Sequence, residues 1–187
     1  DLSKPLVLAI TVAWTVMFGR VLVEVGVLNP PLLRMIWIPI AASALVGLLY
    51  CVYLFIYSRQ HKEKSEVEFS NPFDLGAAIK FGLIYAGVLL VSRAAQLYLG
   101  DPGVILSSVI SGAADVDAVT LSLAELSSNG GLSMEVAGRG ILLATMSNTA
   151  TKGAIALLGG SLALRKPLLI AVGSMLLVGL GVGLFIL

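Results

Sequence analysis

Long runs of apolar residues follow one another along this chain, and short polar or glycine- and proline-containing turns separate them. Apolar runs of more than about 18 residues are typical of helices that cross a membrane. A transmembrane β-barrel would show segments of about 10 residues in which apolar and polar positions alternate, and the chain lacks that alternation. The pattern therefore predicts an all-α integral membrane protein.

Six apolar segments are long enough to cross a hydrocarbon core of about 30 Å, at about 1.5 Å of rise per helical residue. Turn signals mark their limits, such as Asn29-Pro30, Gly100 to Pro102 and the polar residues 127–131. We expect six transmembrane helices arranged as consecutive helical hairpins, at residues 5–27, 32–57, 72–99, 102–126, 134–158 and 167–187.

The chain is predicted to form one transmembrane domain over residues 1–187, with both ends on the same side of the membrane. The spacing of Arg20 and Glu24 before one turn is similar to that of Arg93 and Gln96 before another. This similarity suggests hairpin repeats at 1–57, 72–126 and 134–187, with a polar loop at 58–71. Because the chain begins with Asp1, we expect a mature product or part of a longer protein.

Composition supports the membrane prediction. Of the 187 residues, 58% are hydrophobic and 12% are charged, whereas a soluble domain carries about 25% charged residues. The net charge is +1 and the charges are scattered, so no basic face for nucleic acid is expected. The single cysteine, Cys51, lies in an apolar run and is predicted to be a packing residue. Basic residues favour, weakly, a cytoplasmic position for the loop 58–71.

Polar residues near the middle of two apolar segments predict a site inside the membrane. Asp115 and Asp117 lie in the segment 102–126, where each carboxylate costs roughly 2.5–3.5 kcal/mol on insertion scales. The short turn at 127–131 makes the segment 134–158 its antiparallel neighbour, with polar residues at the same depth. The predicted ion-binding or translocation residues are Asp115, Asp117, Thr120, Ser147, Asn148, Thr149 and Lys152.

Carboxylate, amide and hydroxyl oxygens suit hard cations such as Mg²⁺, Ca²⁺, Mn²⁺ or Na⁺, and a buried carboxylate can equally carry a proton. Asp115 and Asp117 are the predicted metal ligands if a metal is bound, and no organic cofactor is expected. Residues two apart lie about 200° apart on a regular helix. Either the helix is unwound near Gly112, or one carboxylate, preferably Asp115, faces the neighbouring segment. Lys152 is a candidate charge partner for it.

Two further patterns concern contacts between helices. Arg20 and Glu24 are four residues apart and are predicted to form a structural ion pair near the membrane interface. Gly179 and Gly183 form a small-xxx-small pair, which predicts close contact with another helix or with a second protomer of a homo-oligomer.

The segment Gly112 to Ser122 (GAADVDAVTLS), with Ser147-Asn148-Thr149 and Lys152, resembles the uncharacterised C-terminal membrane domain of bacterial MgtC/SapB-type membrane proteins. The stretch 20–30 and Asn71-Pro72-Phe73 fit the same family. In that family the domain follows an MgtC-like membrane domain. The resemblance therefore implies a multi-pass protein of the bacterial inner membrane, with an MgtC-like partner domain on a separate or removed segment. It assigns no substrate and no functional residues.

Two functional hypotheses remain open. In the first, the protein is a permease-like module in the lipid bilayer that moves a small cation (a divalent metal ion, Na⁺ or H⁺) by means of its intramembrane carboxylates. In the second, it is a regulatory or structural protein that transports nothing, and the same polar residues lock two helices together. An enzyme is not expected, because the chain contains no phosphate-binding loop, nucleophile elbow or zinc-binding helix.

Overall fold

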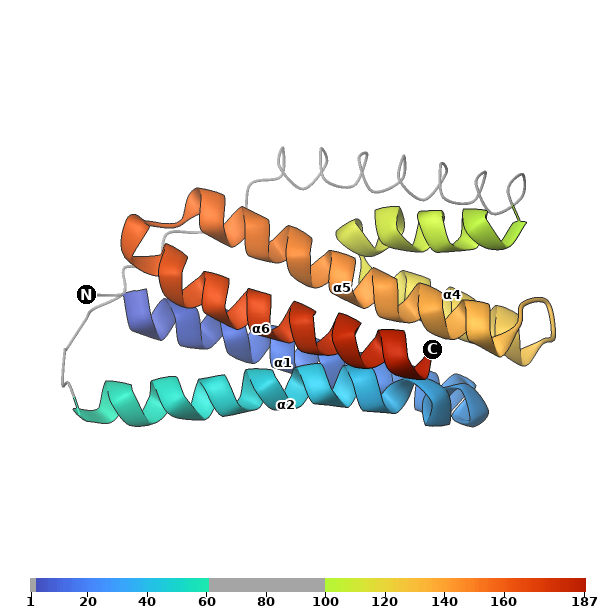
Figure 1. Cartoon of the computed structure of the whole chain (residues 1–187), viewed down its shortest axis with the longest axis horizontal. Helices are drawn as coiled ribbons and strands as arrows, with labels where there is room; N and C mark the ends of the chain where they lie inside the picture. Colours follow the sequence, from blue (N-terminus) through green and yellow to red (C-terminus); the bar gives the residue numbers. More distant parts are fainter. Residues whose placement is uncertain (1–2, 61–99) are drawn as a thin grey trace, which may run out of the picture.

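The computed structural model describes residues 3–60 and 100–187, which are helical except for short connections (Figure 1). The long helices are α1 (Ser3–Leu28), α2 (Pro30–Gln60), α5 (Met134–Gly159) and α6 (Leu162–Ile186). All four are long and apolar enough to cross a membrane, as predicted. The predicted span 72–99 and most of the predicted polar loop 58–71 lie outside the described residues; residues 58–60 are the last of α2.

A single residue separates α1 from α2. Asn29 is buried, and its side-chain oxygen accepts a hydrogen bond of 3.1 Å from the backbone amide of Leu32. Pro30 follows at the first helical position, where a missing amide hydrogen costs nothing. The sequence signal Asn-Pro-Pro therefore produces a helical hairpin at the predicted place.

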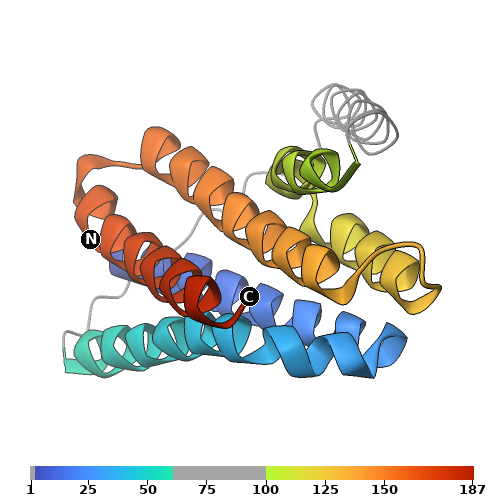
Figure 2. The same cartoon turned by 45° about the vertical axis from the view of Figure 1, so that its right-hand side comes forward.

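The four long helices form an elongated bundle whose axes run roughly along its length (Figure 2). Helix α1 packs against α2, α2 against α6 and α6 against α5. Large side chains such as Phe18, Ile36 and Met175 are fully buried between them. Apolar side chains are also strongly exposed, among them Leu184 (85%) and Phe185 (94%). An apolar outer surface around an apolar core suits a lipid environment.

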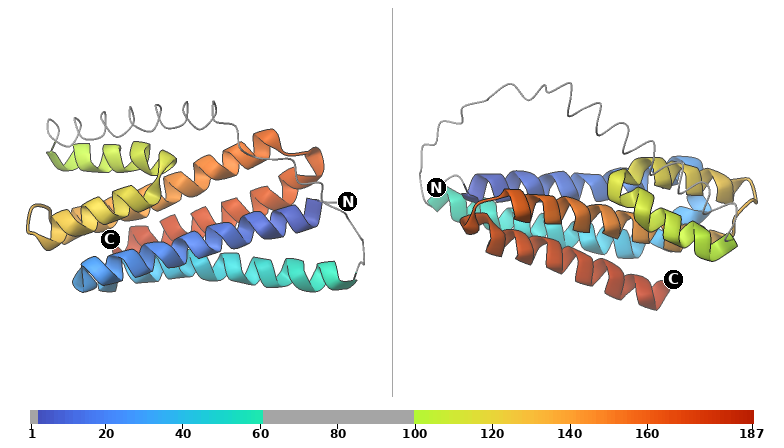
Figure 3. Two further views of the ribbon diagram at one scale, coloured as in Figure 1. Left: turned by 180° about the vertical axis from the view of Figure 1, so that it is seen from behind. Right: turned by 90° about the horizontal axis from the view of Figure 1, so that it is seen from above.

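The predicted fourth span folds differently from the expectation. Residues 100–114 form one helix, and α4 (Val116–Ser128) forms a second, with Asp115 between them. The chain reverses its direction at Asp115, so that both helices extend toward the same end of the bundle (Figures 1 and 3). We call residues 100–128 the re-entrant hairpin and the residues around Asp115 its tip.

Packing against α5 confirms the reversal. A Cβ atom added to Gly140 would lie 2.9 Å from Oγ of Ser108 on the first arm and 2.7 Å from Cδ1 of Leu123 on the second. Residues on opposite sides of Asp115 therefore lie beside the same turn of α5. An unbroken span over 102–126 would separate Ser108 from Leu123 by about 22 Å along its axis.

The tip lies near the middle of the bundle's length. The second arm has 13 residues, or about 20 Å, against about 39 Å for the 26 residues of α5. Each arm is too short to cross a core of about 30 Å. The hairpin therefore enters and leaves at one end, and the beginning of α1 and the end of α6 lie at opposite ends of the bundle (Figure 1), contrary to the expectation from six spans.

Helix α6 also departs from its predicted limits. It begins at Leu162, so that Pro167 lies within the helix rather than at its start. The carbonyl of Pro167 accepts a hydrogen bond of 3.1 Å from the hydroxyl of Tyr50 on α2. The small-residue pair packs inside the bundle: Cβ atoms on Gly179 and Gly183 would collide with side chains of α2 and α5. The pair serves helix contacts within the chain.

Candidate functional site

Asp115 ends one helix and begins the next. Its backbone amide donates to the carbonyl of Ser111 at 2.8 Å, which closes the last turn of the first arm. Its backbone is extended (φ −149°, ψ 114°), and its Oδ1 accepts a hydrogen bond of 3.0 Å from the amide of Asp117. Aspartate is a favoured N-cap because it satisfies such an amide. Of the two alternatives that the sequence left open, the structure has the interrupted helix, with the break at Asp115 rather than at Gly112.

Helix α5 holds the first arm through hydrogen bonds to backbone carbonyls. Asn148 is fully buried, and its side-chain nitrogen donates to the carbonyl of Gly112 at 2.7 Å. The hydroxyl of Ser147 donates to the carbonyl of Val109, also at 2.7 Å. Carbonyls in the last turn of a helix lack intrahelical partners. Asn148 therefore supplies the donor that the helix break at Asp115 removes from Gly112.

Gly112 permits the close approach on which this contact depends. A Cβ atom at Gly112 would lie 2.5 Å from Cα and 2.6 Å from the carbonyl oxygen of Ala144 on α5. These are backbone atoms, which cannot rotate away. Glycine thus brings the first arm against α5 and places its carbonyl within reach of Asn148.

On the other side of the tip, Arg20 of α1 forms an ion pair and hydrogen bond with Oδ2 of Asp117. The predicted pair of Arg20 with Glu24 is not the one observed, because the guanidinium contacts the carboxylate on α4. The charge of Glu24 interacts with those of Arg20, Asp117 and Asp115. Among the described residues, the tip therefore brings together three acidic side chains and the guanidinium of Arg20.

Buried oxygen atoms around the tip are available to accept a proton or a cation. Four of them receive no hydrogen bond from any residue that the structure describes: Oε2 of Glu24, Oδ1 of Asp117, Oγ1 of Thr120 and Oδ1 of Asn148. Thr120 lies one turn beyond Asp117 on α4 and is fully buried. Buried polar atoms without partners are uncommon in folded proteins and are often found where function requires them.

The remaining predicted residues contribute less. The hydroxyl of Thr149 bonds to the carbonyl of Thr145 within α5. The side chain of Lys152 is exposed, and in the described part of the chain it makes no ion pair, so the predicted pairing with an aspartate is not observed. Across residues 3–60 and 100–187, no three His, Cys, Asp or Glu side chains are placed to share a metal ion.

Sequence reasoning missed two parts of this site, the carbonyl of Gly112 and the guanidinium of Arg20. A glycine three residues before an intramembrane aspartate gave a signal for the first. For the second, the signal was that Arg20 and Asp117 are opposite charges within apolar segments, where charges usually pair. The local spacing of Arg20 and Glu24 concealed it, because it supplied a nearer partner.

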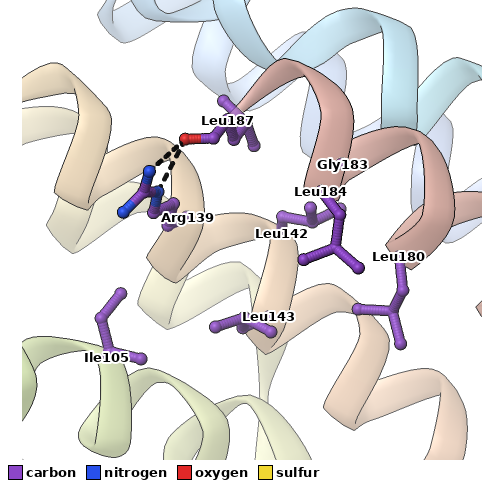
Figure 4. Close-up of a pocket in the computed structure, with 8 residues that line it drawn as sticks. All are labelled: Ile105, Arg139, Leu142, Leu143, Leu180, Gly183, Leu184 and Leu187. Carbon is purple, nitrogen blue, oxygen red and sulfur yellow. Dashed lines mark hydrogen bonds between the residues drawn. The ribbon is translucent and has the colours of Figure 1, made fainter.

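A separate hollow of about 470 Å³ lies between the first arm, α5 and α6 (Figure 4). Leucines such as Leu142, Leu143 and Leu184 line it. Arg139 lies at its edge, where it donates to the carbonyl of Leu187 and forms an ion pair of 2.7 Å with Glu135. An apolar lining offers no ligands to a cation, so this hollow is not part of the tip site.

Comparisons with known proteins give a family without an assigned activity. Residues 1–160 match the model of "Domain of unknown function (DUF4010)". A protein of Aquifex aeolicus (strain VF5), described as "Uncharacterized protein", is 33% identical over 165 residues, which cover 88% of this chain and 72% of that protein. No solved structure matches the chain.

Proposed function

The chain belongs to the DUF4010 family, and from the geometry of the re-entrant hairpin we propose that it is a membrane transport protein for a small monovalent cation, H⁺ or Na⁺. The observation that carries the proposal is the tip itself. It brings two helix ends and the carboxylates of Asp115 and Asp117 to the middle of an apolar bundle, where they interact electrostatically with Glu24. Interrupted helices at mid-membrane are characteristic of ion and substrate sites in transporters, because their exposed backbone groups act as ligands.

The charge of the tip supports a cation rather than an anion. Asp115 and Asp117 occupy the start of α4, where the helix dipole would otherwise attract an anion. Among the described residues, Arg20 pairs with Asp117, while Oε2 of Glu24 and Oδ1 of Asp117 are buried and receive no hydrogen bond. A cation or a proton is the species that such carboxylate oxygens accept.

The setting of this proposal is a multi-pass protein of the bacterial inner membrane. The four long apolar helices support a membrane location, and the resemblance to the C-terminal domain of MgtC/SapB-type proteins suggests the inner membrane. A full set of six membrane-spanning helices is not part of the proposal, because residues 100–128 double back. Partnership with an MgtC-like domain and assembly into a homo-oligomer stay predictions.

The second candidate is a structural lock with no transport. Its support is the pair of hydrogen bonds from Ser147 and Asn148 to the first arm, and the ion pair between Arg20 and Asp117. Together these contacts fix the hairpin against α1 and α5. A regulatory protein could use such a lock to keep one fixed conformation.

Flux measurements on the protein reconstituted into liposomes separate the two candidates. The probes are a pH-sensitive dye, Na⁺ and, as a third arm, Mg²⁺. The informative variant is Asp115→Asn, because asparagine caps a helix as well as aspartate does and removes only the charge. Its matched control is Glu125→Gln, an exposed acid on the same helix.

Transport predicts H⁺ or Na⁺ flux that falls at least tenfold in Asp115→Asn and is unchanged in Glu125→Gln. Absence of flux of all three ions in the parent protein rejects the transport proposal and favours the lock. If the Asp115→Asn variant still shows flux, the transport hypothesis stands, but the tip is not the transport site. Mg²⁺ flux alone would show that the proposed cation is wrong.

A further inference from the structure

Glu24 is an acid of the tip that forms no ion pair with the residues that the structure describes. Arg20, one turn earlier on α1, contacts Asp117 instead. Oε2 of Glu24 and Oδ1 of Asp117 are both buried, and neither accepts a hydrogen bond from a described residue. The two carboxylates also repel each other electrostatically. Two ionised carboxylates that interact inside an apolar bundle are unfavourable, and one proton removes the conflict.

The proton belongs on Glu24. Oδ2 of Asp117 contacts the guanidinium of Arg20, whereas no ion pair of Glu24 is present among the described residues. A protonated carboxyl group also supplies an O–H donor in a region where the unpartnered oxygens of Asp117 and Asn148 can only accept. We propose that Glu24 is the proton-carrying residue of this protein and that Arg20 exchanges between Asp117 and Glu24 as the proton moves.

The positions of the three side chains permit this exchange. Arg20 and Glu24 are four residues apart on α1 and therefore lie on one face of the helix. The side chain of Arg20 is 59% exposed, so it is not confined by packing. Among the described residues, Asp115 is the third charged group that acts on Glu24. Of the other helices packed on α1, α2 carries the exposed Arg34 near this level, and the charges of α6 lie at the opposite end of the bundle.

The exchange conserves charge and protons. At the start, Asp117 is ionised, Arg20 is paired with it and Glu24 is protonated, so the three groups sum to zero. A proton that arrives from water on Asp117 breaks the ion pair, and the guanidinium moves to Glu24. The proton of Glu24 then leaves, and the sum is again zero. One proton has entered and one has left.

This inference deepens the proposed function, since it names H⁺ as the cation and Glu24 as its carrier, but its test does not require flux. Infrared difference spectra of the reconstituted protein, recorded against pH, detect the C=O stretching band of a protonated buried carboxyl group. Glu24→Gln should abolish one such band, and Glu125→Gln, an exposed acid, should leave it in place.

The exchange itself is tested at Asp117. In Asp117→Asn the guanidinium of Arg20 has lost its partner and should pair with Glu24, which then ionises, so the band should disappear although Glu24 is present. The double variant Arg20→Gln/Asp117→Asn removes both charges and should recover the band. Thiol labelling of the buried Cys51 checks that each variant is folded, and Asp117→Ser replaces Asp117→Asn if the latter is not.

A spectrum of the parent protein without a band that depends on Glu24 overturns the proposal, whatever the flux. A band that persists in Asp117→Asn shows that burial alone protonates Glu24, and it overturns the exchange. A band with the predicted behaviour in a protein that transports no ion supports the exchange and rejects the transport function, so the two failures are distinguishable.

Discussion

Replacement of Gly112 by alanine tests the contact on which the hairpin depends. The new Cβ would lie 2.5 Å from Cα and 2.6 Å from the carbonyl oxygen of Ala144, so the first arm must move away from α5. Overpacking of this kind costs about 1–3 kcal/mol. The movement also lengthens the 2.7 Å hydrogen bond from Asn148, worth about 0.6–1.5 kcal/mol. We expect Gly112→Ala to lower the free energy of unfolding by about 2–4 kcal/mol, summed from these two contributions.

Cys51 provides the assay, because it is the single cysteine of the chain and is buried. Its labelling by a maleimide fluorophore, as a denaturing detergent is titrated into mixed micelles, follows the exposure of the bundle interior. The matched control is Gly173→Ala, a helical glycine whose added Cβ would meet nothing within 4 Å. That change should leave stability within about 1 kcal/mol of the parent.

A second substitution decides whether the clash is with the backbone. Ala144→Gly removes the Cβ that would lie 2.7 Å from the new atom, but Cα and the carbonyl oxygen remain. It should therefore restore little of the stability lost in Gly112→Ala. Stability of Gly112→Ala within about 0.5 kcal/mol of the parent, or full rescue by Ala144→Gly, would refute the reasoning.

Two further predictions concern the same architecture. Asp101→Cys and Asn129→Cys, each in a Cys51→Ala background, should react with a membrane-impermeant maleimide from the same side of sealed vesicles, since both arms end there; labelling from opposite sides would restore the crossing span. Gly179→Ala should destabilise the bundle by about 1–3 kcal/mol, because its Cβ would lie 2.3 Å from Oγ of Ser43. Gly181→Ala should not destabilise it, and the same unfolding titration measures both variants.

Much of the fold followed from local signals. Asn29-Pro30 carries both an N-cap acceptor and a residue with no amide hydrogen to satisfy, so the turn is fixed by chemistry within a few residues. Ser133 likewise caps α5 through the amide of Val136. These limits could be predicted because the groups that determine them lie next to each other in sequence.

The reversal at Asp115 could not be predicted in the same way. Residues 102–126 are apolar over a length that suits one membrane crossing. A single aspartate within them does not indicate how sharply the chain turns. The turn is held by Asn148, which lies 36 positions from Gly112, and by Arg20, which lies 97 positions from Asp117. Hydropathy measures length and polarity along the chain and carries no information about such distant contacts. The start of α6 before Pro167 was missed for a different reason, since a proline within a helix costs one hydrogen bond that packing can offset.

The re-entrant hairpin also has a consequence for the synthesis of the protein. Domains and helices emerge from the ribosome in order, and the contacts that hold the hairpin come partly from α5, which is made after it. Until then, residues 102–126 present the insertion machinery with an apolar segment of spanning length. A nascent chain that stops before residue 134 should therefore place this segment across the membrane. Arrival of α5 would then withdraw it, so that the topology of the finished protein is decided after insertion has begun.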